Sequence, residues 1–112
     1  MSFDARTEQH NGMTVVTFTG DLDIASEDDA TAALEAAIGN GAVLVADLRE
    51  LAFLDSTGVR VLLLAHLHAQ ERGMRFGVAR GDGMIRRLLD VTRIDQRFPV
   101  VDDPAELLEV TQ

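Results

Sequence analysis

The chain has 112 residues, 46% of them hydrophobic and none of them cysteine, so we expect one domain (residues 1–112) without disulfides, thiolate metal sites or a thiol nucleophile. Its formal net charge is −9, of which residues 1–40 carry −7; this disfavours nucleic acid and anionic membranes as partners and favours a basic protein surface. No apolar run reaches the ~18 residues of a membrane span, and residues 1–4 lack signal-peptide features, so the expected location is cytoplasmic.

The first part of the chain predicts a β-hairpin and a helix. Residues 3–7 alternate apolar and polar side chains, and residues 13–19 are rich in β-branched ones. His10-Asn11-Gly12 between them carries the Asn-Gly signal of a tight turn, so the two strands should pair antiparallel. Ser26 is placed to cap the following helix, which ends at residues 39–41. The apolar stripe of this helix consists of Ala30, Ala33, Leu34, Ala37 and Ile38.

A buried strand, a long helix and another strand are predicted in the middle of the chain. Residues 42–46 are apolar on both faces, which indicates a central strand covered on its two sides. The helix should run from residue 56 to about residue 71, and residues 74–78 alternate as a strand. The core face of the helix is predicted to hold Val59, Leu62, Leu63, Ala65 and Ala69. Two apolar residues outside that sector, Val61 and Leu64, should be exposed.

The last part of the chain predicts two helices separated by a strand. Asp82 is placed to cap the first helix, residues 98–101 form the strand, and residues 103–106 open the second helix with a cap, a first-turn proline and an acid at its third position. The inward side chains of the first helix should be Met84, Ile85, Leu88 and Leu89. The order β β α β α β α β α predicts an α/β fold with a mixed sheet, an N-terminal antiparallel hairpin, roughly parallel crossovers and about four helices.

The segment most informative about function is Asp55-Ser56-Thr57-Gly58. It follows the buried strand at its carboxyl end and opens the long helix, and open α/β sheets place their sites at that end. Taken by itself, Ser56 is interpreted as a helix N-cap that satisfies one free amide and contributes roughly 1 kcal/mol to stability.

Several motifs, in order along the chain, are similar to those of a known family. They are Gly20-Asp21-Leu22-Asp23, Asp47-Leu48, Phe53-Leu54-Asp55-Ser56-Thr57-Gly58 and Arg87-Leu88-Leu89-Asp90-Val91-Thr92. Over essentially its whole length the chain resembles the STAS family of anti-sigma factor antagonists. In that family the serine after this aspartate is phosphorylated by a partner that is both anti-sigma factor and serine kinase, and a metal-dependent serine phosphatase removes the phosphate. The resemblance implies that Ser56 is the phosphoacceptor.

The resemblance also implies a protein-interaction switch. The unphosphorylated protein would bind the anti-sigma factor and free a sigma factor, and phosphorylation of Ser56 would end that binding. The protein would be a kinase substrate and not an enzyme, with no cofactor and no metal. An alternative in the binding class is a STAS accessory subunit of a transporter or signalling complex that is never phosphorylated. An alternative in the enzyme class is a weak nucleotide-binding or hydrolytic domain.

Further residues are candidates for partner contact. Asp21 and Asp23 either rim the Ser56 end of the sheet and meet basic residues of the partner, or lie in a solvated loop. Asp55 has three open roles: to orient the serine, to assist magnesium-nucleotide placement in the kinase, or to accept backbone amides. The remaining candidates are Thr57, Gly58, Val61 and Leu64, of which the last two form an apolar strip that runs along the helix from the phosphoacceptor.

Two positions depart from the family pattern. Asp28-Asp29 stands where many members open the first helix with a proline, and Arg93-Ile94 stands where Gly-Leu is common. Neither touches the acceptor. The first departure adds charge beside the expected interface, so we expect it to influence which kinase is recognised.

The histidines do not indicate an enzyme or a metal site. His66 falls in the apolar sector of the long helix and is interpreted as a satisfied core histidine. His68 lies two residues further on, so the two side chains point about 200° apart and cannot share a metal. His10 lies in the hairpin loop. The segment around Ser56 also lacks the elbow motif and the paired base of a serine hydrolase.

Overall fold

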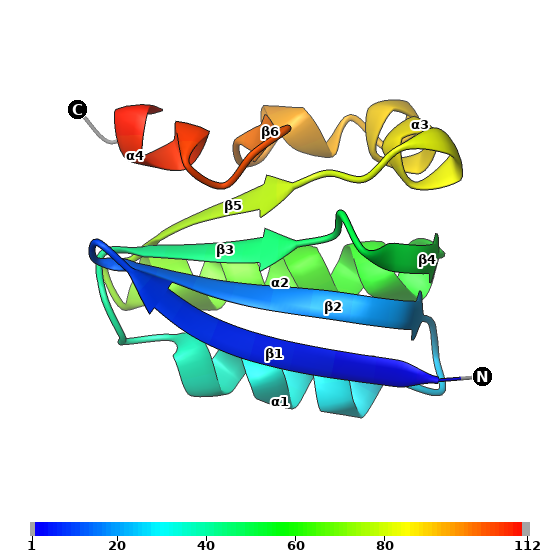
Figure 1. Cartoon of the computed structure of the whole chain (residues 1–112), viewed down its shortest axis with the longest axis horizontal. Helices are drawn as coiled ribbons and strands as arrows, with labels where there is room; N and C mark the ends of the chain where they lie inside the picture. Colours follow the sequence, from blue (N-terminus) through cyan, green and yellow to red (C-terminus); the bar gives the residue numbers. More distant parts are fainter. Residues whose placement is uncertain (1, 111–112) are drawn as a thin grey trace.

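A mixed six-stranded sheet with helices packed along it organises residues 2–110, the part of the chain that the computed structural model describes (Figure 1). The strands are β1 (Phe3–His10), β2 (Met13–Leu22), β3 (Val43–Asp47), β4 (Leu51–Leu54), β5 (Arg75–Ala79) and β6 (Val100–Val101). The helices are α1 (Glu27–Ala37), α2 (Ser56–Glu71), α3 (Gly83–Val91), the 3-10 helix η1 (Ile94–Gln96) and α4 (Glu106–Val110). The strand order is β1-β2-β3-β5-β6, with β4 paired to β2. Among the described strands, β1 and β2 pair antiparallel and the other pairs are parallel, so the predicted fold class is confirmed.

The N-terminal hairpin forms where the Asn-Gly signal predicted it. β1 pairs with β2 along its whole length. Asn11 and Gly12 both have positive φ angles, 54° and 81°, as in the tight turn that matches the twist of the two strands. β1 is also an edge of the sheet, and its side chains Asp4, Arg6 and Glu8 are exposed.

β3 lies in the middle of the sheet, and all five of its residues are buried, as predicted. The strand that follows was missed. After Asp47 the chain leaves the sheet, and Leu51–Leu54 re-enters it as β4, parallel to β2. The register of β2 shifts between Gly20 and Asp21 to accommodate this pairing. The prediction that Ser56 follows the central strand is therefore wrong, because Ser56 follows β4, which pairs with β2 beyond the end of β3.

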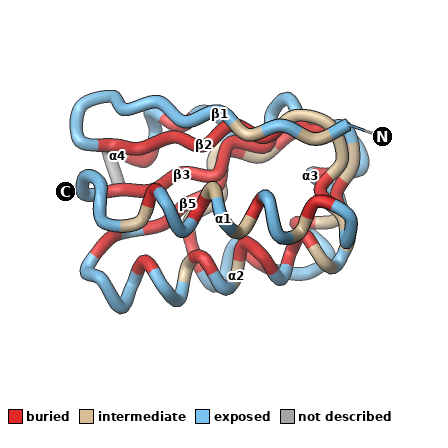
Figure 2. The backbone as a smooth tube through the Cα atoms, turned by 90° about the horizontal axis from the view of Figure 1, so that it is seen from below, coloured by how far each residue is buried: buried red, intermediate tan, exposed pale blue. Residues whose placement is uncertain are grey.

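Two hydrophobic cores lie on the two faces of the sheet. The larger core includes Phe18, Leu34 and Leu62 and lies under α1 and α2, which run side by side on one face (Figure 2). The smaller core joins Val45 of β3 to Leu107 of α4. The central strand is therefore apolar on both faces because each face packs against a different core. Within residues 2–110, no helix combines the length and apolar character needed to span a membrane.

The exposure predicted for Val61 is wrong, whereas that for Leu64 is confirmed. Val61 is only 3% exposed, and Leu64 is 44% exposed. α1 lies against this flank of α2, since Arg60 pairs with Glu27 at 2.7 Å and His68 bonds to Glu35 of the same helix. The angular position of Val61 on an isolated helix does not reveal that a second helix covers it.

In α3, the inward orientation predicted for Met84 is also wrong. Met84 is 56% exposed, and Val91 at the end of the helix is 72% exposed. Ile85 and Leu89, four residues apart, are the buried side chains of α3, and Leu88 is half-buried. The helix therefore buries a stripe narrower than its apolar content suggests.

The predicted helix caps have mixed outcomes. At the start of α4, Asp103 accepts a hydrogen bond from the backbone of Ala105 at 2.9 Å, and Glu106 accepts one from the backbone of Asp103 at 2.9 Å. This reciprocal arrangement is a capping box, as the sequence predicted. Asp82 precedes α3 and Ser26 precedes α1, but neither side chain makes a capping hydrogen bond.

Candidate functional site

Asp55, and not Ser56, is the N-cap of α2. The Asp55 backbone is extended, and its Oδ1 accepts hydrogen bonds from the amides of Thr57 at 2.9 Å and Gly58 at 3.3 Å. Ser56 is the first residue of the helix and is exposed, and its hydroxyl makes no hydrogen bond with any residue that the structure describes. The capping role predicted for Ser56 is therefore wrong, and among the three roles open for Asp55 the geometry supports acceptance of backbone amides.

Gly58 and Thr57 complete the first turn of α2. Gly58 is buried, and a Cβ at its position would collide with the side chain of Leu54 and lie 3.0 Å from that of Leu22. Glycine therefore allows α2 to begin close against the ends of β2 and β4. Thr57 is partly exposed beside Ser56. Of these two candidates for partner contact, only Thr57 has a side chain at the surface.

The carboxyl end of β2 brings Asp21 and Asp23 to the same edge of the sheet as Ser56. Leu22, the last residue of β2, pairs with Leu54, the last residue of β4, so the two strands end together. Asp21 and Asp23 are both partly exposed. The structure therefore brings together four predicted side chains at one end of the sheet, Asp21, Asp23, Asp55 and Ser56, and we call this surface the Ser56 rim.

Ser26 holds the loop of the Ser56 rim in place. This serine is 5% exposed; its hydroxyl donates to the carbonyl of Asp21 at 2.7 Å and accepts from the amide of Asp23 at 3.1 Å. Asp23 in turn accepts a hydrogen bond from the amide of Ala25 at 3.0 Å. The loop therefore has a defined shape and presents Ile24, which is 78% exposed and which sequence reasoning missed. A lone isoleucine between Asp23 and Ala25 in a loop carries no periodic signal.

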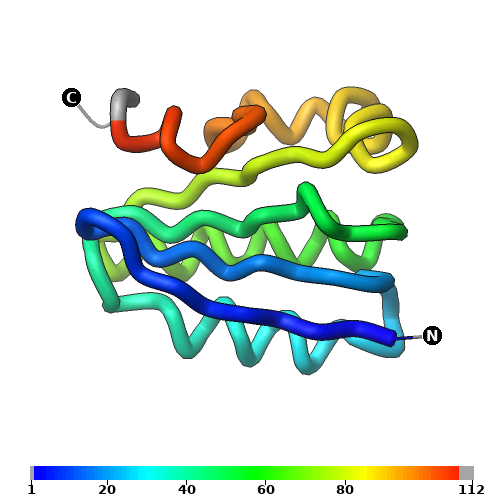
Figure 3. Tube along the Cα trace, in the orientation of Figure 1, coloured from blue at the N-terminus to red at the C-terminus, as the bar shows by residue number. Residues whose placement is uncertain are grey.

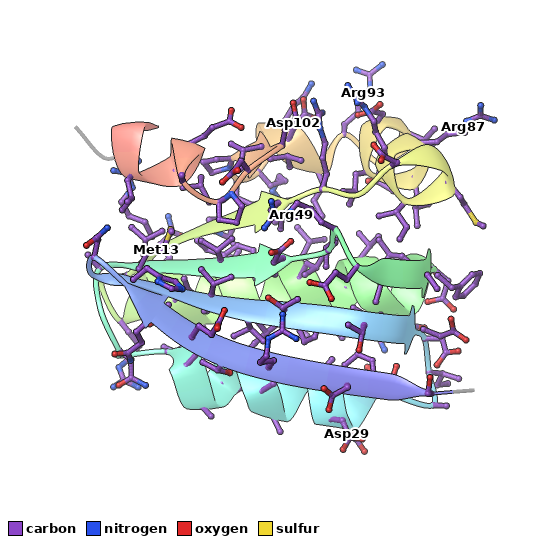
Figure 4. All side chains as sticks on the ribbon, viewed as in Figure 1. Met13, Asp29, Arg49, Arg87, Arg93 and Asp102 are labelled. Carbon is purple, nitrogen blue, oxygen red and sulfur yellow. The ribbon has the colours of Figure 1, made fainter. Side chains whose placement is uncertain are left out.

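The Asp47-Leu48 motif has a structural explanation. Asp47 is 3% exposed and binds Arg49 through both carboxylate oxygens, at 3.0 Å to Nε and 2.9 Å to Nη2 (Arg49 is labelled in Figure 4). Asp47 also accepts the backbone amide of Arg49 at 3.1 Å. The hydrogen bond from Asp47 raises the pKa of Arg49 above its usual value. The pair fixes the turn by which the chain passes from β3 to β4, and hence to Ser56.

The two histidines of α2 lie in opposite environments, as their spacing predicted. The His66 ring packs against Phe76 and Phe98, with centroids 6.2 and 5.4 Å away. Its buried Nδ1 has no hydrogen-bond partner in the part of the chain that the structure describes, so the prediction of a satisfied histidine is wrong. Burial, assisted by the charge of Arg97, lowers the pKa of His66. The hydrogen bond to Glu35 raises the pKa of His68. No cluster of potential metal ligands occurs in the described part of the chain.

Comparisons with known proteins identify relatives of this chain. The family model of the STAS domain matches residues 4–107. The chain is 26% identical over 110 residues to an anti-sigma F factor antagonist of Paenibacillus polymyxa, covering 96% of this chain and 94% of that protein. It is 31% identical over 102 residues to the anti-sigma-F factor antagonist RsfB of Mycobacterium tuberculosis, covering 87% of this chain and 80% of that protein.

A solved structure agrees with these sequence matches. The crystal structure of an anti-sigma factor antagonist from Mycobacterium paratuberculosis superimposes on this chain with a TM-score of 0.86 at 27% identity. The superposition covers 97% of this chain and 93% of that one. The shared fold therefore includes the strands and helices that form the Ser56 rim.

Proposed function

The chain belongs to the anti-sigma factor antagonist family of STAS domain proteins, and we propose that phosphorylation of Ser56 controls its binding to an anti-sigma factor. In the unphosphorylated state the chain binds an anti-sigma factor that is also a serine kinase, which frees a sigma factor. Phosphorylation by that kinase ends the binding, and a metal-dependent serine phosphatase restores it. Antagonists of this family are regulators and not enzymes, so the chain acts by binding.

The observation that carries this proposal is the free hydroxyl of Ser56. It is exposed at the first position of α2, while Asp55 satisfies the amides of Thr57 and Gly58. No hydrogen bond among the described residues uses this hydroxyl, so a kinase can reach and modify it without opening the helix. A serine that capped the helix with its own oxygen would lose that hydrogen bond on modification.

A phosphate on Ser56 would change the charge of the surface and keep the fold. It would lie at the N-terminus of a 16-residue helix, where the helix dipole favours an anion. The phosphate adds about −1.5 to −2 charges. Against one partner carboxylate at ~4 Å, with an effective dielectric constant near 20, the repulsion reaches several kcal/mol. Binding would therefore weaken by orders of magnitude.

The charge of the Ser56 rim favours a basic surface on the partner. Asp21 and Asp23 lie beside Ser56, and Asp28 and Asp29 are exposed in the first turn of the neighbouring α1. In the described residues none of these four carboxylates forms an ion pair. Arginine or lysine side chains of the anti-sigma factor would meet them, which steers the encounter and fixes its register.

The phosphoacceptor is tested by incubating the purified chain with magnesium-ATP and each anti-sigma factor kinase of the same genome, followed by peptide mass spectrometry. We expect phosphate on Ser56 and at most a trace on Thr57. Phosphate at another residue with Ser56 unmodified would contradict the assignment. Binding without any phosphorylation would instead favour an accessory subunit of another complex.

The charge mechanism is tested by calorimetric titration of the same anti-sigma factor with two variants. We expect Ser56→Ala to bind as the wild type does and Ser56→Asp to bind at least tenfold more weakly. Since neither change removes a hydrogen bond, both variants should stay folded, which circular dichroism checks. Equal affinities of the two variants would exclude the repulsion mechanism.

Leu64 is the remaining candidate contact from the apolar strip, because Val61 is buried. Leu64 lies two turns along α2 from Ser56, between Arg60 and His68. We expect Leu64→Asp to leave the melting temperature nearly unchanged and to weaken binding of the anti-sigma factor about tenfold. Leu67→Asp is a matched control, since Leu67 is 42% exposed on the same helix. Equal effects of the two changes would remove Leu64 from the interface.

A further inference from the structure

A cleft of about 280 Å³ lies between α2 and the segment that follows α3. Val59 and Leu63 of α2 form one wall, and the other wall includes Ile94, Arg93 and Arg97. No carboxylate lines it. The cleft is smaller than the sites that usually enclose small-molecule ligands, so it suits a side chain from another protein.

Arg93 occupies this cleft at a conformational cost. Its φ and ψ angles are 55° and 34°, in the left-handed region that ends many helices and is normally occupied by glycine or asparagine. Other residues adopt it at a cost of roughly 1–2 kcal/mol. Strain of this kind at a surface position is a reason to search for a role of the side chain. Here the side chain is an exposed arginine.

The two arginines that line the cleft form no ion pair with the described residues. Neither Arg93 nor Arg97 lies within ion-pairing distance of a carboxylate in residues 2–110. Arg87 and Arg93 project from the α3 edge of the molecule, opposite the α1 edge that carries Asp29 (Figure 4). The chain trace in Figure 3 shows the same separation of the N-terminal and C-terminal elements. In a chain of net charge −9 this edge is therefore suited to a negative group.

The cleft and the phosphoacceptor lie on the same side of α2. Val59 and Leu63 lie three and seven residues after Ser56, so all three share one face of the helix. A protein that covers Ser56 would reach the cleft one turn further along. The wall residues would then contact the methylene groups of an inserted side chain, and the two guanidinium groups would bind its terminal group.

We propose that the cleft receives an aspartate or glutamate side chain of the anti-sigma factor, whose carboxylate is bound by Arg93 and Arg97. This inference rests on the proposed function. The interface then has two regions of opposite charge: the acidic Ser56 rim binds basic residues of the anti-sigma factor, and the basic cleft binds an acidic one. Such an arrangement fixes the orientation of the partner and discriminates among related anti-sigma factors. The same carboxylate is a negative group that a phosphate on Ser56 would repel.

The test measures affinity and melting temperature for Arg93→Gly, Arg97→Gln and the control Arg87→Gln, with the anti-sigma factor that binds the wild type. We expect Arg93→Gly to raise the melting temperature, because glycine accepts this backbone conformation, and to weaken binding about tenfold. Arg97→Gln should weaken binding similarly, and both effects should shrink at high salt. Arg87 does not line the cleft, so Arg87→Gln should change affinity less than twofold.

The outcomes separate this inference from the proposed function. If the wild type binds, Ser56→Asp does not, and the two cleft variants bind as tightly as the control, the cleft is not a docking site and the phosphorylation switch stands. A loss of affinity as large for Arg87→Gln as for the cleft variants would indicate general attraction and would also overturn the inference. If no anti-sigma factor of the genome binds the wild type, the proposed function is wrong. The assignment of an anti-sigma factor side chain to the cleft is then wrong as well.

Discussion

Two serines stand at the starts of the two neighbouring helices α1 and α2, and their hydroxyls have opposite availability. Ser26 is buried and uses its hydroxyl both to donate to Asp21 and to accept from Asp23. Ser56 is exposed, and its hydroxyl makes no hydrogen bond within residues 2–110. The difference arises because Ser26 bonds to the loop that precedes α1, whereas Asp55 and not Ser56 caps α2. Position at a helix start therefore does not decide whether a serine is structural or open to modification; the residues around it do.

The largest effect in this comparison is expected for Ser26→Ala. The change leaves the amide of Asp23 and the carbonyl of Asp21 without their partner in a buried place, which should lower the free energy of unfolding by about 1–3 kcal/mol. Urea denaturation followed by circular dichroism measures it. A loss below about 0.5 kcal/mol would mean that water replaces the hydroxyl and that the loop does not depend on it.

A smaller loss is expected for Asp55→Ala. It removes the acceptor for two amides in the first turn of α2, which should lower the free energy of unfolding by about 1 kcal/mol. Asp55→Asn keeps an acceptor oxygen and should recover most of that loss. The same denaturation experiment applies. If the asparagine variant is as unstable as the alanine variant, the role of Asp55 is not capping.

Ser56→Ala should have almost no effect on stability. The exposed hydroxyl makes no hydrogen bond to the described residues, so the free energy of unfolding should change by less than about 0.5 kcal/mol. Ser26→Ala is the matched control, with the same atoms removed from a buried serine. Similar losses in the free energy of unfolding for the two variants would contradict the difference between the two serines and show that Ser56 has a structural role.

The two histidines of α2 extend the comparison to pH. The hydrogen bond to Glu35 raises the pKa of His68 in the folded protein. The contribution of this pair to stability is therefore fully present below the pKa that His68 has in the unfolded chain. It is lost as the pH rises through the pKa of His68 in the folded protein. Burial lowers the pKa of His66 in the folded protein. The packing of the neutral His66 ring therefore contributes to stability above the pKa that His66 has in the unfolded chain. This contribution is lost as the pH falls through the pKa of His66 in the folded protein. Imidazole NMR titration should place His66 below and His68 above the ordinary value, and Glu35→Gln should lower the pKa of His68 alone. A higher pKa for His66 than for His68 would contradict the environments described for the two side chains.

Local signals predicted most of the fold. The Asn11-Gly12 turn and the Asp103 to Glu106 capping box involve neighbours in sequence, and both form as predicted. β4 was missed because a run of four apolar residues fits a loop as well as a strand, and its pairing depends on the register shift in β2. Short-range patterns contain no information about that shift.

The candidate site was predicted by residue type, and tertiary structure decided the details. Asp55 and Ser56 are both good capping residues, and only the backbone geometry selects the first. Val61 lies outside the core sector of α2 taken alone, and α1 buries it. Arginine itself does not favour the left-handed conformation of Arg93, and the signal for it is the glycine that the family pattern has at this position.

The edge strand β1 has a consequence for how the protein behaves at high concentration. Its outer backbone is unpaired in the described sheet, and an unpaired edge can template strand addition and aggregation. Asp4, Arg6 and Glu8 place alternating charges on the exposed face of this strand, and an incoming strand would have to desolvate or match them. At the other edge β6 has only two residues and offers little to pair with. Both edges therefore oppose polymerisation through the sheet.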